Sequence, residues 1–205
     1  MDLFLYNFPW MIYNLYLAFL PVIFGLFLFR MPNKFYSFLL GIIWFLYLPN
    51  TIYVYTDLQH LIEQWSNVTV FIQVLLVIQY AIFVTLGLAC YLVAFYPFEK
   101  MLRGAPWRET FRPYIIILVN FVIGFALVVG KFHRVNSWDV LIAPQTAMNG
   151  IIAVLQSDDY MGLVILFGIF ANCFYFLFRD RVIAFMSKRL DHTLLATPQS
   201  LSEKK

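Results

Sequence analysis

Long apolar stretches separated by short polar segments make up most of the chain from residue 10 to residue 178. A helix needs roughly 20 mostly apolar residues to cross a bilayer. Five stretches meet this requirement, and they cover residues 10–29, 36–55, 68–96, 113–130 and 160–178. The third is long enough to need tilt or a protruding end. The pattern predicts an all-α integral membrane protein, built as a bundle of about five transmembrane helices.

The second stretch contains Pro49 and Asn50 before its apolar run is finished. Proline removes a backbone donor and clashes with the preceding turn, so a kink or an end of the helix is expected there. Two interpretations stay open. One is a break at membrane depth, where the freed carbonyl groups would line a cavity. The other is a simple helix end at the membrane interface.

Composition agrees with the pattern. Hydrophobic residues make up 62% of the chain and charged residues only 12%, whereas about a quarter of the residues of a soluble domain are charged. The 205 residues are enough for one compact bundle and too few for a separate soluble domain. We expect a single polytopic membrane domain over residues 1–190, followed by a disordered cytoplasmic tail at 191–205.

The placement of Lys and Arg predicts the orientation. Of the 14 basic residues, twelve flank the spans on one side, which leaves Lys131 and Arg134 on the other. Loops rich in Lys and Arg stay in the cytoplasm. The N-terminus is therefore expected outside and the C-terminus in the cytoplasm.

Two polar clusters interrupt the apolar pattern, and both fall at the predicted exterior ends of spans. The first runs from Leu48 to His60, and the second from Gly130 to Asp139. Ionisable residues are costly in membrane segments, so their concentration at two helix ends points to a site.

In the first cluster, Asp57 and His60 are three residues apart and would share one face of a helix. An Asp beside a His orients the imidazole and raises its basicity, which suits a general base. In the alternative interpretation, Thr56 or Asp57 is only the N-cap of a helix.

The second cluster places a cation beside hydrogen-bonding side chains. Arg134 suits a lipid phosphate or a carboxylate, and Trp138 suits an interfacial anchor. Asn136 or Ser137 is expected to cap an interfacial helix. That helix, broken by Pro144, would lie on the outer surface as a partial lid.

Because spans two and four both end outside, the two clusters are expected to form one site. The candidate catalytic residues are Asp57, His60, Ser137 and Asp139. The candidate substrate-binding or head-group-binding residues are Asn50, Arg134, Asn136 and Trp138.

Three chemistries compete at this site. Ser137 with His60 and an Asp would form an acyl-transfer triad, or His60 would act as the base for an incoming hydroxyl or amine. Alternatively, four side chains would bind a divalent metal, namely Asp57, His60, His133 and Asp139. No zinc-type spacing is present, so no metal site is predicted, and the cofactor question stays open.

Polar residues inside the spans are few. The four amides Gln73, Gln79, Asn120 and Asn172 are expected to form interhelical hydrogen bonds. Gly124 and Gly168 are expected to allow close helix approach. No Asp, Glu, Lys or Arg is expected deep in a span, which argues against a proton-coupled pump or an ion channel.

Two motifs carry a family resemblance. Residues 44–61 read W-F-L-Y-L-P-N-T-I-Y-V-Y-T-D-L-Q-H-L, and residues 130–141 read G-K-F-H-R-V-N-S-W-D-V-L. In both motifs the chain resembles a bacterial family of membrane proteins known as domain of unknown function 1361, over about residues 10–180. The resemblance implies that eight residues belong to the shared pattern: Asn50, Asp57, His60, Arg134, Asn136, Ser137, Trp138 and Asp139. Lys131 stands where the family pattern has Arg. The resemblance implies a bacterial plasma membrane and no established activity.

Two function classes follow. The first is a partner, assembly or accessory subunit of a membrane complex with an exterior polar site. The second is a membrane enzyme that acts on lipid or lipoprotein substrates at the outer leaflet, using a His–Asp pair and an Arg. The expected partners are the lipid bilayer, another membrane protein and a lipid ligand. Nucleic acid is not expected, because the basic residues lie in short loops without a recognition module.

Overall fold

The computed structural model describes residues 2–28, 31–66, 68–102 and 106–188, and helices make up nearly all of them. The tail at 191–205, expected to be disordered, lies outside the described residues. In chain order the helices are α1 (Asp2–Leu28), α2 (Lys34–Tyr47), α3 (Pro49–Thr56), α4 (Leu58–Trp65), α5 (Val70–Leu102), α6 (Pro106–His133), α7 (Asp139–Ile142), α8 (Pro144–Leu155) and α9 (Asp158–Met186).

Five helices are long and apolar enough to cross a membrane, as the sequence predicts. They cover Phe4–Leu28, Lys34–Trp65, Val70–Leu102, Glu109–His133 and Asp158–Met186. Each begins or ends beyond the apolar run that predicts it, because the helices continue into the flanking polar residues.

The second of these helices passes through Pro49 without leaving helical geometry. Leu48, between α2 and α3, has φ −56° and ψ −39°. Side chains of the next turn satisfy carbonyl groups near the proline: Asn50 Nδ2 donates to the Tyr47 oxygen at 3.0 Å, and Thr51 Oγ1 donates to the Leu48 oxygen at 2.7 Å. A break within a continuing helix therefore describes this position better than a helix end.

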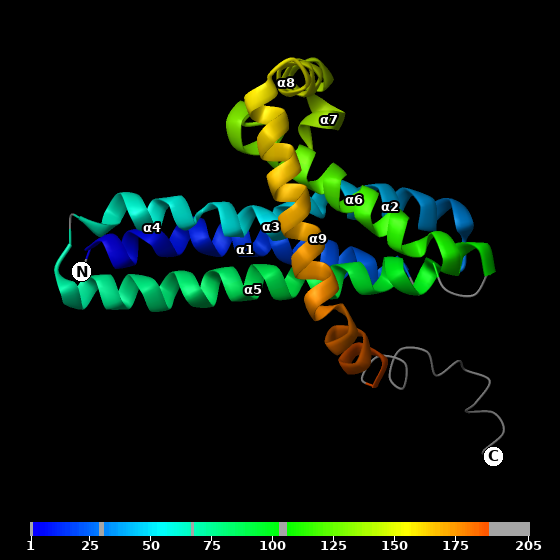
Figure 1. The fold of residues 1–205 in the computed structure, drawn as a ribbon, viewed down its shortest axis with the longest axis horizontal. Coiled ribbons are helices and arrows are strands. Elements are labelled where there is room, and N and C mark those ends of the chain that lie inside the picture. Colours follow the sequence, from blue (N-terminus) through cyan, green and yellow to red (C-terminus); the bar gives the residue numbers. More distant parts are fainter. Residues whose placement is uncertain (1, 29–30, 67, 103–105, 189–205) are drawn as a thin grey trace.

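The long helices do not all run in one direction. Helices α1, α3–α4 and α5 lie side by side, whereas α9 crosses them steeply and packs on α6 (Figure 1). Helices α7 and α8 lie together at the end of α6 that leads into them (Figure 1). The break at Pro144 between two short helices is as predicted.

Glycines bring α6 and α9 into backbone contact. A Cβ atom added to Gly124 would lie 2.8 Å from the backbone nitrogen of Gly168. Real Cβ atoms essentially never approach so closely, so the predicted close approach at this pair is confirmed.

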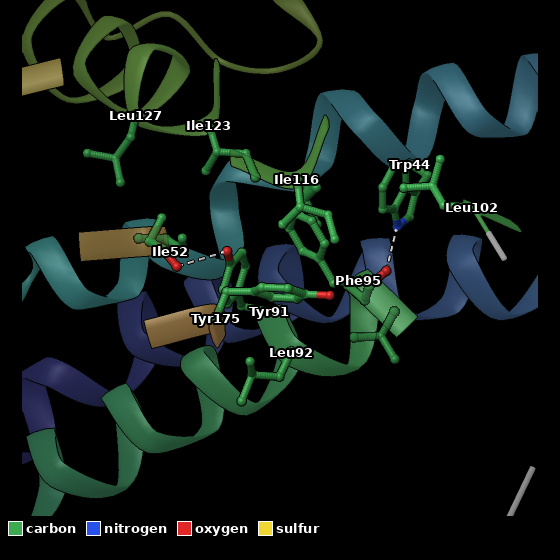
Figure 2. Close-up of a cluster of buried hydrophobic side chains, with 14 residues drawn as sticks. Trp44, Ile52, Tyr91, Leu92, Phe95, Leu102, Ile116, Ile123, Leu127 and Tyr175 are labelled. Carbon is green, nitrogen blue, oxygen red and sulfur yellow. Dashed lines mark hydrogen bonds between the residues drawn. The ribbon is translucent and has the colours of Figure 1, made fainter. Parts of the chain in front are cut away.

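Aromatic and aliphatic side chains from six helices form the largest core cluster. Figure 2 shows Trp44, Phe95, Tyr91 and Ile116 in this cluster. The Trp44 indole donates to the carbonyl oxygen of Ala94 at 3.1 Å, so its polar group is satisfied within the apolar core.

The span amides do link helices. Asn120 Nδ2 on α6 donates to Asn172 Oδ1 on α9 at 3.0 Å, and Tyr91 of α5 donates to Asn120 Oδ1 at 2.6 Å. Gln79 donates to the Phe4 carbonyl at 3.1 Å, and Gln73 donates to the Trp65 carbonyl at 2.9 Å. The predicted interhelical hydrogen bonds are therefore confirmed.

Glu99 is a buried charged residue near the end of α5 that the sequence pattern did not single out. This carboxylate lies in α5 and is 1% exposed. It accepts hydrogen bonds from the Arg179 guanidinium and the Tyr175 hydroxyl, and its Oε1 lies 3.7 Å from Arg112 Nε. The sequence pattern ends the third span at residue 96, but the helix continues to Leu102 and carries Glu99 against α6 and α9.

Candidate functional site

Asp57 joins three parts of the chain. It lies at the junction of α3 and α4 and is 3% exposed. Asn14 Nδ2 on α1 donates to Asp57 Oδ2 at 2.8 Å, and Lys131 Nζ on α6 lies 3.3 Å from Asp57 Oδ1. The same ammonium group lies 5.2 Å from the centre of the Tyr53 ring. The buried carboxylate thus has a compensating charge and a neutral donor, which a buried ion pair requires.

The capping interpretation is confirmed for the backbone, since Asp57 is the N-cap residue of α4, but not for its side chain. The Asp57 side chain makes no cap hydrogen bond to α4, and Thr56 Oγ1 donates backward to the Tyr53 carbonyl at 2.7 Å. Asp57 stands at the N-cap position of the backbone, but its carboxylate binds Asn14 and Lys131 on other helices.

His60 does not pair with Asp57 in the described part of the chain. Its Nδ1 lies 3.0 Å from Glu63 Oε2, and its ring packs edge-on against Trp10 with 5.5 Å between centres. Because Glu63 is also three residues from His60, the spacing that favours Asp57 as its partner favours Glu63 equally. The predicted His–Asp pair is therefore wrong.

The two polar clusters do meet, at Asn50 and Ser137. Asn50 Nδ2 donates to Ser137 Oγ at 3.1 Å, across 87 positions of sequence. Ser137 therefore contacts an amide of α3. The acyl-transfer triad of Ser137 with His60 is not assembled, since His60 binds Glu63 instead.

Asp139 makes only local hydrogen bonds among the residues that the structure describes. Its Oδ2 accepts from the Asn136 backbone nitrogen at 2.7 Å and from Asn136 Nδ2 at 3.2 Å. Trp138, not Asn136 or Ser137, occupies the N-cap position of α7, without a side-chain bond. The expected cap is therefore wrong, and Asp139 instead closes the loop that precedes the helix.

Arg134 is exposed and has φ 53°, and it is the one non-glycine residue with positive φ in the described ranges. This backbone region is costly for a residue with a Cβ atom. Within the same ranges its guanidinium makes no hydrogen bond or ion pair, although it lies close enough to Tyr53 to interact electrostatically.

The two polar clusters are therefore in contact, but through other residue pairs than the sequence predicts. Asp57 reaches the second cluster through Lys131, and Asn50 reaches it through Ser137, but His60 remains apart from Arg134 and Asp139. In the described part of the chain, no group of three or more His, Cys, Asp or Glu residues is placed to hold a metal ion together. The four-residue metal alternative with His133 is therefore not supported.

A cavity of about 270 Å³ lies between the helices that these contacts join. It is lined by α1, by the α2–α3 junction, by α6, by the segment at 135–140 and by α8. Its polar lining residues are Tyr13, Asn14, Asn50, Tyr53, Asn136 and Ser137. Sequence reasoning missed Asn14 and gave Lys131 no partner. A lone amide in the first span and a lysine at the end of the fourth were the available signals.

An all-α architecture with five helices able to cross a membrane and a polar cluster at helix ends defines a multi-pass membrane-protein class. Within this class, the chain belongs to the family described as "Protein of unknown function (DUF1361)", whose model matches residues 13–174. The match confirms the resemblance carried by the two motifs and includes both of them. Comparison with curated proteins and with solved structures finds no match.

Proposed function

We propose that this protein is a non-catalytic accessory subunit of a membrane complex, with its N-terminus outside and its C-terminus in the cytoplasm of a bacterial plasma membrane. The observation that carries this proposal is direct pairing between candidate site residues. Asp57 binds Lys131 and Asn14, and Ser137 binds Asn50.

Pairing of this kind favours architecture over catalysis. A general base must reach the proton it removes, but the Asp57 carboxylate is buried against an ammonium group and an amide. Satisfied buried polar networks rigidify a core. The network thus supports a scaffold in which α1, α3 and α6 are held in fixed register.

The outer surface suits membrane partners. Large apolar side chains on the long helices are exposed, among them Phe71 at 70% and Leu118 at 64%. The short helix α7 also exposes Leu141 at 70% and Ile142 at 74%. Lipid and a neighbouring membrane protein are the partners that such surfaces accept.

The test is the size of the native assembly. The full chain, tagged and expressed in its own host, is extracted in mild detergent, and its particle mass is compared with the 24.1 kDa of one chain. We expect an assembly with a second protein that persists in His60→Ala and is lost in Asp57→Leu. A wild-type protein that carries only detergent and lipid would contradict the accessory role.

The alternative is an enzyme acting on lipid or lipoprotein at the outer leaflet. The cavity beside Ser137 favours a ligand there, but the position of His60 does not favour the His–Asp mechanism. If His60→Ala leaves abundance and assembly unchanged but alters the cellular lipid or lipoprotein profile, the enzyme replaces the accessory subunit as the better proposal.

A further inference from the structure

We propose that the cavity between α1, α3, α6 and α8 binds one acyl chain of an anionic phospholipid, with the lipid phosphate against Arg134. This inference does not require the accessory role, because it rests on the lining of the cavity and on the loop beside it.

The cavity lining changes from polar to apolar along three helices. On the helix formed by α2 and α3, which runs toward the polar cluster, Tyr53 of α3 lies nearer that cluster than Phe45 of α2 does. On α6, which also runs toward it, Gly130 lies nearer than Val122 does. On α1, which runs away from it, Asn14 precedes Leu17. The lining residues at the apolar end are Leu17, Phe45, Leu46, Val122, Ile123 and Ala126.

A ligand that fits both ends must itself be amphiphilic. An apolar recess offers water no hydrogen-bond partners, so the apolar end suits a hydrocarbon chain. The volume of about 270 Å³ is near the lower limit of small-molecule pockets, roughly 300–1,000 Å³. It therefore suits one chain rather than a whole lipid. The bilayer around the helices supplies such chains directly.

Arg134 supplies the specificity for the head group. It directly precedes the lining residues Val135, Asn136 and Ser137, and it lies within electrostatic range of Tyr53, which also lines the cavity. A guanidinium group binds a phosphate through two parallel hydrogen bonds. Its left-handed backbone conformation is of the kind that persists at ligand-binding positions. The phosphate would thus lie at the polar end, where the chain enters.

The test is lipid retention by the full-length protein. The purified chain is reconstituted with an equimolar mixture of phosphatidylglycerol and phosphatidylcholine, transferred to detergent, and examined by native mass spectrometry. We expect one phosphatidylglycerol to stay bound. Ala126→Phe, which fills the apolar end, should lower the retained fraction about tenfold, because it removes the space for the chain.

Arg134→Gly should abolish the preference for phosphatidylglycerol, and it leaves the apolar end unchanged. The matched controls are Leu118→Phe, on the outer face of α6, and Arg181→Gln, an exposed cation at the other end of α9. Both should retain lipid as the wild type does. If Ala126→Phe does not fold, Ala126→Leu replaces it.

Several results would overturn the proposal. One is equal retention by the wild type and by both cavity and loop variants, which would place the lipid on the outer helix surface. Another is equal binding of the two lipids by the wild type, which would remove the role of Arg134. Displacement of the lipid by sodium phosphate alone would show that the site takes free phosphate rather than a phospholipid.

Discussion

Asp57 and Glu99 are both almost completely buried, and each contacts a cation on another helix. Their surroundings differ. Glu99 faces two guanidinium groups and a phenol, and the space beside it is only about 10 Å³. Among the residues that the structure describes, Asp57 faces one ammonium group and an amide, and the amide of Asn14 also lines a cavity of about 270 Å³.

The two buried carboxylates therefore have different structural roles. Around Glu99, the charged groups close the packing of α5 against α6 and α9 and leave room for about one water. Around Asp57, fewer charged groups hold the helices together, and Asn14, which contacts Asp57, also lines the cavity. The Glu99 carboxylate therefore belongs to a tightly packed cluster, whereas the Asp57 carboxylate contacts Asn14, a side chain that lines the cavity.

The largest expected effect is at Glu99. Glu99→Gln removes the negative charge between Arg179 and Arg112, so both guanidinium groups lose an ion-pair partner that is 1% exposed. We expect the free energy of unfolding to fall by about 3–5 kcal/mol, measured by far-UV circular dichroism during denaturation in mixed micelles. Glu109→Gln is the matched control, since Glu109 also pairs with Arg112 but is 47% exposed. A loss no larger than the control would show that the cluster is not a packing device.

A smaller loss is expected at the other carboxylate. Asp57→Asn keeps an acceptor for Asn14 but removes the charge opposite one cation, Lys131, whereas Glu99→Gln removes it opposite two. We expect a loss of about 2 kcal/mol in the same denaturation measurement. Asp180→Asn, at an 87% exposed side chain, is the control. A loss equal to that of Glu99→Gln would contradict the different structural roles assigned to the two carboxylates.

Arg134→Gly should change stability in the opposite direction. Glycine adopts φ 53° without a Cβ penalty, so we expect a gain of about 0.5–1 kcal/mol, together with the loss of lipid preference given above. Thermal unfolding and lipid retention measured on one preparation check both effects. A loss of stability would show that the arginine holds the fold rather than a ligand.

The smallest effect is expected at His60. It pairs with Glu63 at an exposed position, with side-chain exposures of 39% and 63%. His60→Ala should therefore change the free energy of unfolding by no more than about 0.5 kcal/mol. A loss comparable to that of Asp57→Asn would show that His60 contributes to stability as much as the buried contacts of Asp57 do.

The sequence predicts the five apolar helices, the interruption at Pro49 and the meeting of the two polar clusters. These features follow from hydropathy, proline chemistry and loop charge, all of which act locally. The pairing of Asp57 with Lys131 is not local. It depends on how α6 packs against the α3–α4 junction, and a spacing of three residues cannot report that.

The burial of Glu99 also depends on contacts between residues that are distant in sequence. Its position three residues beyond the expected end of the third span made it resemble a cytoplasmic flank. Helix α9 packs over this position, and its Arg179 and Tyr175 side chains hydrogen-bond to the buried Glu99 carboxylate. The sequence predicts that the two polar clusters meet, but it does not reveal which charged groups pair with each other.

The close contact of Gly124 with Gly168 has a mechanical consequence. Helix α9 is fixed there against α6 and again at Arg179 against Glu99. A rigid rod fixed at two points cannot tilt freely. Because α8 joins α9 through only Gln156 and Ser157, these contacts farther along α9 also restrict the movement of α8 and of the cavity wall that it forms.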